Sequence, residues 1–243
     1  MSDVEGNVAY EQTENVPDKA AKRKRRREEL KQKVLKVYPF SLQKRQKREQ
    51  DEARNIAIMV PALQADYICG KIGVYYNEIS TLERQDRYIP ETVFTDTSLF
   101  GERSLTTIST FLTISKVEKG CEEMGRPHTI VVSAAAIRVA ELTREMRKMN
   151  AHVLKLFARH IKVEQQIRML KSQPVAIAVG TPGRLMALVE QDALLLDGIE
   201  NVVVDTSHLD AKRRSIFDIP ECGKDLLDLL YKMKPYKMKI ILF

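Results

Sequence analysis

The sequence of 243 residues is 44% hydrophobic, so it can bury one substantial core but is too short for two full-sized nucleotide-binding domains. Its net charge of +7 is unevenly placed, because residues 17–54 hold 15 Lys and Arg against 6 acids, whereas residues 1–16 hold four acids and no base. By difference, residues 55–243 carry only +2, so the sequence predicts a basic tail rather than a generally basic protein.

Cysteine spacing and hydropathy exclude several classes of protein. Cys69, Cys121 and Cys222 lie far apart, without a Cys-x-x-Cys or a nearby Cys/His pair, so neither a zinc site nor a disulfide framework is predicted. No stretch approaches the ~18 consecutive apolar residues of a membrane span, and the N-terminus lacks an apolar signal-peptide core. We therefore expect a soluble intracellular protein that uses no metal and no membrane.

Residues 1–54 are predicted to form a basic N-terminal extension, disordered or helical. The acidic start shows no periodicity and indicates disorder. The basic run then opens with six consecutive cations, Lys22, Arg23, Lys24, Arg25, Arg26 and Arg27. Charge this dense favours an acidic partner, either an import receptor or a nucleic-acid backbone. The alternative is a solvated helix face with Glu28 and Glu29 as local counter-ions.

Residues 55–103 show a mixed pattern, and we interpret them as a lead-in specific to the family of this chain. Ile56–Val60 predicts a strand or a buried helix turn, and Val74–Tyr76 is a candidate core segment. Neither segment repeats with a clean period. The main domain is then predicted over residues 104–243.

From Ser104 onward, helical and extended apolar patterns alternate. The predicted helices cover residues 104–123, 134–148, the segment marked by Val163, Ile167 and Leu170, and the segment Leu226–Leu230. In the second of these helices Ile137, Leu142 and Met146 are available to face inward. The predicted strands cover residues 130–133, 153–157, 175–179, 202–204 and 238–243. This alternation is typical of right-handed βαβ units, so we predict an α/β fold with a single doubly wound parallel sheet flanked by helices.

The junction Val179–Leu185 between a strand and a helix has a sequence suited to binding a phosphate group. Thr181 can cap the helix, and Pro182 can occupy its first position, where a proline loses no hydrogen bond. Free amides of the first turn would then point outward beside Arg184, a bidentate donor for an anionic oxygen. Asn201–Asp205 is predicted to end at the same edge of the sheet and carries an acid there. The alternative is a plain structural cap.

The order of these motifs resembles the first RecA-like domain of DEAD-box RNA helicases, over residues 96–243. Gly180–Leu185 matches the Thr-Pro-Gly-Arg-Leu motif, which contacts RNA backbone in that family. The resemblance therefore implies RNA contacts at the four residues Thr181, Pro182, Gly183 and Arg184. Gln166 and Leu170 fall where the family has a Gln-bearing helix. Ser133–Arg138 falls where it has Pro-Thr-Arg-Glu-Leu, which makes Arg138 a further candidate RNA ligand.

The residues that serve ATP chemistry in DEAD-box helicases are replaced in this chain. Asp205–His208 stands at the Asp-Glu-Ala-Asp position; its first residue remains available to magnesium, but Thr206 has no carboxylate to take a proton from water. The place of the phosphate loop is Thr97–Ser104, where Phe100 and Glu102 stand instead of glycines. We expect bulk and negative charge to keep phosphate out, so no cofactor is predicted.

A second candidate phosphate loop, Ala65–Ile72, has one glycine before Lys71 but lacks the hydroxyl residue that should follow. An ATPase that uses this loop together with Asp205 is therefore an alternative function. The predicted strand over residues 238–243 resembles the strand that leads into the Ser-Ala-Thr motif of helicases, and the sequence ends before that motif. We therefore expect that this chain alone runs no helicase cycle.

These departures, together with the basic tail, resemble more narrowly the Cms family of ribosomal small-subunit proteins, nuclear factors found with early pre-ribosomes. The likeness spans residues 61–243 and is carried by Gln64–Tyr67, Ile89–Glu91, Phe94–Thr97, Ser133–Glu141, Gly180–Leu185 and Asp205–Arg214. It implies a non-catalytic factor of the nucleus and nucleolus that binds pre-ribosomal RNA and small-subunit assembly factors. The alternatives are a protein-docking scaffold without RNA contact and, after that, a weak ATPase.

Overall fold

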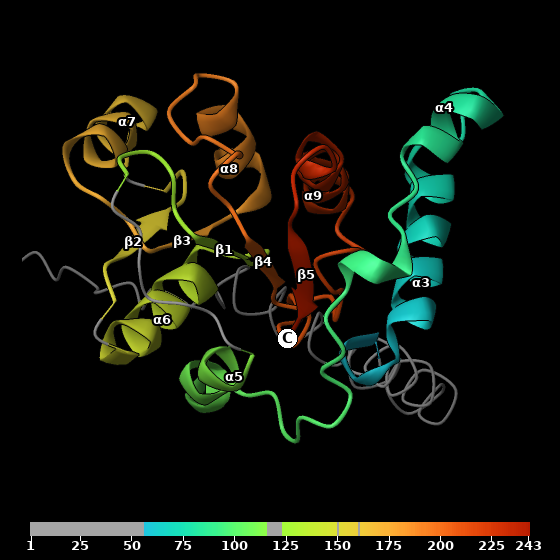
Figure 1. Ribbon diagram of the computed structural model, residues 1–243, viewed down its shortest axis with the longest axis horizontal. Helices are drawn as coiled ribbons and strands as arrows, with labels where there is room; N and C mark the ends of the chain where they lie inside the picture. Colours follow the sequence, from blue (N-terminus) through green and yellow to red (C-terminus); the bar gives the residue numbers. More distant parts are fainter. Residues whose placement is uncertain (1–55, 116–122, 150, 160) are drawn as a thin grey trace, which may run out of the picture. The chain divides into compact units, whose positions relative to one another are not determined.

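A five-stranded sheet organises the part of the chain that the computed structural model describes, residues 56–115, 123–149, 151–159 and 161–243 (Figure 1). All pairs of neighbouring strands are parallel, and the strand order is β2-β3-β1-β4-β5. The strands are β1 (Thr129–Val132), β2 (Val153–Leu156), β3 (Ile177–Gly180), β4 (Asn201–Val204) and β5 (Lys239–Leu242). The predicted doubly wound parallel sheet is confirmed.

The strands form where short apolar runs, rich in β-branched residues, are buried on both sides of the sheet. β1 and β3, with the sequences Thr-Ile-Val-Val and Ile-Ala-Val-Gly, are buried at every position. Parallel sheets need such continuous runs because helices cover both of their faces. This explains why the sequence predicts all five strands of the sheet, with ends that differ from the observed ones by at most two residues.

Helices cover both faces of this sheet. The α-helices are α3 (Pro61–Tyr75), α4 (Thr81–Asp86), α5 (Ile108–Ile114), α6 (Ala136–Met146), α7 (Val163–Ser172), α8 (Pro182–Val189) and α9 (Pro220–Met233), and short 3-10 turns lie at Glu91–Val93, Leu105–Thr107 and Arg147–Met149. α3, α7, α8 and α9 pack on one face, and α5 and α6 on the other. None of these described helices is long and apolar enough to cross a membrane.

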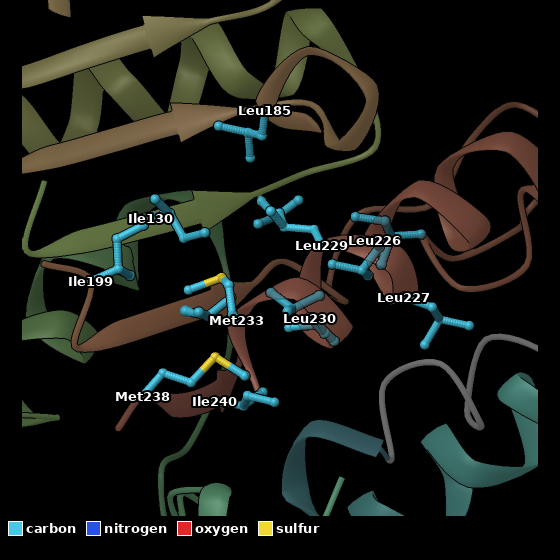
Figure 2. Packing of buried hydrophobic residues seen from close by; sticks show 14 of the residues in the cluster. Ile130, Leu185, Ile199, Leu226, Leu227, Leu229, Leu230, Met233, Met238 and Ile240 are labelled. Carbon is cyan, nitrogen blue, oxygen red and sulfur yellow. The ribbon is translucent and has the colours of Figure 1, made fainter. Parts of the chain in front are cut away.

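The core on the α9 side is the larger of the two. α9 buries one apolar stripe, in which leucines recur at helical spacing, in a cluster with residues of β1, β4 and β5. Figure 2 shows Leu230 and Met233 of α9 gathered with Ile130 of β1 and Ile240 of β5, and Leu185 of α8 near them. This packing fixes α8 and α9 over the sheet, so the segments that precede these helices are held in place.

The predicted helix over residues 104–123 is shorter than expected in the described part of the chain. A 3-10 turn at Leu105–Thr107 leads into α5, which ends at Ile114, and residues 116–122 lie outside the described residues. Half of residues 104–115 are threonine or isoleucine, and β-branched residues are weak helix formers. The hydroxyl of Thr113 also donates to the backbone carbonyl of Ser109 (3.0 Å), which competes with the helical pattern.

One side chain of α6 faces solvent although the sequence predicted it to face inward. Ile137 is 64% exposed, whereas Val139, Leu142 and Met146 are fully buried. Ile137 lies about 200° around the helix from Val139, because each residue advances an α-helix by about 100°. The buried positions of α6 are therefore 138, 139, 142, 143 and 146, and its apolar ones are 139, 142 and 146.

Residues 56–103 pack against the same core as the sheet. Ile56–Ile58 form a helical turn rather than a strand. Tyr76 is buried, but Val74 is 68% exposed, so the predicted core segment is only partly correct. The hydroxyl of Tyr75 donates to the backbone carbonyl of Phe217 (2.8 Å), which ties the end of α3 to the segment before α9. Residues 56–103 are thus part of the folded domain, and α3 packs into the same core as α9.

Gly180, at the end of β3, is a position where the fold leaves no room for a side chain. A Cβ there would lie 2.8 Å from the backbone carbonyl oxygen of Leu156 and 2.8 Å from the side chain of Leu185. We predict that Gly180→Ala lowers the free energy of unfolding by about 1–3 kcal/mol, the usual cost of overpacking. Urea denaturation measures this change.

Gly70→Ala is the matched control for that substitution. Gly70 lies within α3, and no described atom lies within 4 Å of the position a Cβ would take. Alanine should therefore raise the free energy of unfolding by about 0.5–1 kcal/mol, because glycine is a poor helix former. Destabilisation of the same size at both positions would contradict the close approach at Gly180.

Candidate functional site at the carboxyl edge of the sheet

The carboxyl ends of β1, β3 and β4 lie side by side, because Val132 pairs with Gly180 on one side and with Val204 on the other. The segments that follow these strands therefore start next to one another, and among their first residues are Thr181 and Asp205. Parallel α/β sheets bind ligands at this edge. The expectation that the Thr181 junction and Asp205 share one edge is confirmed by the strand pairing.

A buried ion pair occupies the centre of this edge. Asp205 is 1% exposed, and its Oδ2 atom accepts hydrogen bonds from Nε of Arg138 (2.9 Å) and from the hydroxyl of Ser133 (3.0 Å). Its Oδ1 atom accepts from the hydroxyl of Ser207 (2.7 Å), which in turn accepts from Nη2 of Arg138 (3.0 Å). Every oxygen of the carboxylate is thus satisfied from within the chain, as a buried charge requires.

This ion pair corrects two expectations from the sequence. Arg138, expected as an RNA ligand, is 9% exposed and compensates a buried carboxylate, so its guanidinium is not free to bind RNA. Asp205, expected to be available to magnesium, is already neutralised, and a metal ion would have to displace the guanidinium. Within the described residues, no group of three His, Cys, Asp or Glu side chains could hold a metal ion.

Thr206 has a structural role at the position that corresponds to the glutamate of the Asp-Glu-Ala-Asp motif. Its side chain is 1% exposed, and its hydroxyl donates to the backbone carbonyl of Phe243 (2.8 Å). Its backbone N–H donates to the same oxygen (2.7 Å). Both bonds connect the end of β4 to the end of β5, so the position is committed to holding the edge of the sheet together.

The loop over residues 97–104 has the reverse polarity of a phosphate loop. Its carbonyl oxygens point at the guanidinium of Arg103: Nη2 donates to the carbonyl of Thr97 (2.6 Å), and Nη1 donates to that of Phe100 (3.0 Å). Nη2 also donates to the carbonyl of Ala57 (3.0 Å). A phosphate loop would instead direct backbone N–H groups at an anion. Burial lowers the pKa of Arg103, but these carbonyls provide the acceptors that its charged form needs.

A cavity of about 300 Å³ remains between this loop and the end of β4. Gly101, Glu102 and Arg103 line one side, and Thr206 and Ser207 line the other. Glu102 is exposed at this cavity, and its carboxylate disfavours an anionic ligand. The volume lies at the lower end of the range of small-molecule pockets.

The second candidate phosphate loop is not a loop. Ala65–Ile72 lies inside α3, where the backbone N–H groups are engaged in helical hydrogen bonds. Nζ of Lys71 donates to Oδ1 of Asp218 (2.5 Å), an ion pair that joins α3 to the segment before α9. The alternative of a phosphate loop at this position is therefore wrong: α3 continues through both of its interior glycines, Gly70 and Gly73.

The start of α8 matches the predicted junction in its backbone but not in its cap. Pro182 occupies the first helical position and is buried, and Thr181 is the N-cap residue. The side chain of Thr181 makes no capping hydrogen bond; instead its backbone carbonyl accepts from the N–H groups of Arg184 (3.1 Å) and Leu185 (3.0 Å). Gly183 is exposed beside it. The first turn of α8 therefore presents backbone at the surface.

Arg184 is half-buried and bonded within the domain. Its Nη1 atom donates to Oε1 of Gln166 (2.8 Å) and to the backbone carbonyl of Ile161 (3.1 Å). Gln166 is fully buried in α7, and its Nε2 atom donates to the backbone carbonyl of Phe157 (3.2 Å). The Gln-bearing helix noted in the sequence thus holds Arg184 in a fixed orientation at the end of α8 nearest β2.

Sequence reasoning missed Asp225, a residue of α9 that faces the start of α8. Its Oδ2 atom lies 2.7 Å from the position that a Cβ would take at Gly183, so a larger residue there would require the carboxylate of Asp225 to move. Burial, together with the nearby carboxylates of Asp228 and Glu190, raises the pKa of Asp225. An acidic group next to the predicted phosphate-binding turn disfavours a phosphate on that side of it. The basic run Lys22–Arg27 lies outside the described residues.

The Arg138–Asp205 pair yields a direct test. Arg138→Met strands a buried carboxylate, and we predict a loss of about 3–5 kcal/mol in the free energy of unfolding. The double variant Arg138→Met/Asp205→Asn should lose less than the sum of the two single changes, because the stranded charge is then removed. Urea denaturation of the four proteins in a double-mutant cycle measures this coupling, and simple additivity would contradict it.

Two solved structures are similar to this chain. The yeast DEAD-box splicing factor Prp28 aligns with a TM-score of 0.45 and 16% identity, over 62% of this chain and 35% of that chain. A Dbp5 variant of S. cerevisiae bound to Nup159, Gle1, IP6 and ADP aligns with a TM-score of 0.45 and 13% identity, over 76% of this chain and 46% of that chain.

Sequence comparison gives closer relatives. Protein CMS1 of Chaetomium thermophilum is 38% identical over 186 residues, which is 73% of this chain and 74% of that protein. Protein CMSS1 of Xenopus laevis is 37% identical over 64% of this chain and 57% of that protein. Protein CMSS1 of Homo sapiens is 38% identical over 47% of this chain and 42% of that protein. The match thus spans less than two thirds of these two vertebrate proteins. A family model described as CMS1, U3-containing 90S pre-ribosomal complex subunit, matches residues 7–239. As the resemblance in its sequence indicated, the chain belongs to the CMS1 family.

Proposed function

We propose that the protein is a non-catalytic, nucleolar subunit of the 90S pre-ribosome that binds pre-ribosomal RNA and small-subunit assembly factors. Membership of the CMS1 family assigns the chain to ribosome biogenesis. The observation that carries the non-catalytic part is the filling of the carboxyl edge of the sheet by the chain's own arginines. RNA is the proposed ligand of the surface around the start of α8.

Three requirements of ATP hydrolysis are not fulfilled at the positions where DEAD-box helicases fulfil them. The 97–104 loop encloses Arg103 rather than a phosphate group. Asp205 is paired with Arg138 rather than open to a metal ion. Thr206 has no carboxylate to activate water. Phosphate binding, metal binding and water activation are separate steps, so their joint replacement supports a domain without ATP chemistry.

The proposed RNA contact uses Thr181, Gly183 and Arg184. The backbone of the first turn of α8 is exposed at Gly183, and the positive end of the helix dipole favours an anion there. Arg184 keeps donors beyond the two bonds of Nη1, because a guanidinium carries five N–H groups. Pro182 and Arg138 are buried and take no part. The run Lys22–Arg27 is proposed as a second RNA contact or an import signal.

A protein-docking scaffold without RNA contact is the second candidate. The observation that favours it is the side chain of Asp225 beside Gly183, together with the internal hydrogen bonds of Arg184. In that case Arg184 serves only to fix α8 against α7. The two candidates differ in what a change at Arg184 does to RNA recovery.

Crosslinking of the tagged protein to RNA in cells, followed by sequencing, separates them. We expect wild type to recover small-subunit precursor RNA. Arg184→Glu should recover at least about tenfold less of it, because a charge-assisted hydrogen bond contributes about 1.5–3 kcal/mol. Gln166→Leu is the matched control: it removes the internal partner of Arg184 but keeps the arginine. Unchanged RNA recovery with folded Arg184→Glu would remove Arg184 from the RNA contact, and recovery of no specific RNA by wild type would favour the docking scaffold.

Nucleotide binding is tested on the same full-length protein. We expect that Mg·ATP leaves the thermal unfolding temperature unchanged, because a ligand raises it only by binding the folded state. A rise in Tm that grows with ATP concentration and disappears without magnesium would contradict the non-catalytic proposal. Thermal unfolding followed by circular dichroism measures this temperature, and no dye is needed with which the nucleotide could interfere.

A further inference from the structure

The two edges of the sheet are protected in different ways. At β5, Phe94 forms a parallel bridge with Ile240, and the N–H of Thr95 donates to the carbonyl of Ile240 (2.9 Å). Lys239 donates through Nζ to the carbonyl of Thr92 (2.9 Å), so the lead-in covers this edge. At the other edge, β2 pairs with β3 and with no other strand among the described residues.

Positive charge is concentrated around the β2 edge. Residues 144–171 contain eight Lys and Arg against two acids, a net +6, although residues 55–243 as a whole carry only +2. The rest of that region therefore carries −4. We define the basic edge as the six exposed cations of this stretch that have no salt bridge within the described residues: Arg144, Arg147, Lys155, Lys162, Arg168 and Lys171.

The basic edge wraps around one end of the sheet. Arg144 lies in the last turn of α6 and Arg147 in the 3-10 turn after it, on one face of the sheet. Lys155 is the exposed residue of β2, and Lys162 and Lys171 lie at the two ends of α7, on the other face. Figure 1 shows α6 and α7 on either side of β2 at that end. Charge from both faces and from the edge strand between them therefore meets there.

Several cations elsewhere in the described domain are paired, although Lys224, Lys232 and Lys237 are exposed and have no salt bridge within the described residues. Arg87 pairs with Asp228 (2.9 Å) between the loop after α4 and α9, and Arg214 pairs with Asp210 (2.8 Å). Lys71 is likewise paired, as described above. Exposed unpaired cations, in contrast, remain available to an external anion, because their charge is balanced only by mobile ions.

Protection of an edge strand explains only part of this charge. A lysine on an edge strand blocks pairing with another chain, and Lys155 fits that role. The cations on α6 and α7 do not lie on the strand, so edge protection gives no reason for them. A polyanion that runs along the edge would contact all three elements at once.

We propose that the basic edge binds the phosphate backbone of RNA without reading its sequence. This inference rests on the proposed RNA-binding function and adds a contact surface separate from Thr181, Gly183 and Arg184. Lysine and arginine on flexible stems suit a phosphate backbone, whose charge repeats along the strand. The surface would extend RNA contact from the start of α8 around β2.

The test compares two triple variants of the full-length protein. Lys155→Glu/Lys162→Glu/Lys171→Glu reverses three charges of the basic edge, and Lys224→Glu/Lys232→Glu/Lys237→Glu makes the same change in charge at exposed lysines in and after α9. Affinity for a labelled single-stranded RNA oligonucleotide of mixed sequence is measured by fluorescence anisotropy over a series of salt concentrations. Circular dichroism checks that each variant is folded.

We expect the edge variant to bind at least tenfold more weakly than wild type at low salt. The slope of log affinity against log salt should fall by about 2, because each phosphate neutralised on a single strand contributes about 0.7. The α9 variant should keep most of the affinity and of the slope. If the edge variant fails to fold, Arg144→Glu/Arg147→Glu/Arg168→Glu tests the same surface without touching the strand.

The failures of the two proposals are distinguishable. Equal loss in the edge and α9 variants would overturn the basic edge, because net charge alone would then explain binding. Wild-type affinity in the edge variant, with binding lost in Arg184→Glu, would overturn the basic edge and leave the proposed function intact. No binding of wild type to RNA at any salt concentration would remove RNA contact from both, and would point to an acidic protein as the partner of this surface.

Discussion

A carboxylate buried at the end of a central strand is the constraint on which the rest of this edge depends. Asp205 follows β4 directly and is out of reach of solvent, so its charge needs a partner from within the chain. That partner is Arg138 of α6, and hydroxyls of Ser133 and Ser207 complete the network. Since these residues come from after β1, from α6 and from after β4, the pair fixes one helix and two strand ends relative to one another.

The same physical rule explains the 97–104 loop. Arg103 lies too deep to be hydrated fully, and the loop bends so that its carbonyl oxygens serve as acceptors. A loop folded around a cation cannot also direct its amides at an anion. The loss of nucleotide chemistry proposed for this chain is therefore more than the absence of a few catalytic residues. These positions have structural roles, so a glutamate in place of Thr206 would not by itself create a site for ATP hydrolysis.

Local pattern was sufficient for the sheet and insufficient for the site. A parallel strand is buried on both faces, so continuous apolar runs such as Ile130–Val132 and Val202–Val204 predict strands. Helix ends were less predictable, because β-branched residues weaken the segment after Ser104. The pairing of Arg138 with Asp205 spans 67 residues. No period or spacing reports such a contact, so the sequence offers only the family resemblance as a role for Arg138 and does not reveal its structural partner.

The two sheet edges complete the same argument. An open edge strand invites pairing with another chain, and this fold prevents it by covering β5 with its own lead-in and by placing Lys155 on β2. A covered edge is closed to every partner. A charged edge is closed to another strand, which would have to desolvate the lysine, but it stays open to a polyanion, which neutralises the charge. The means of protection at β2 therefore determines which kind of molecule can approach it.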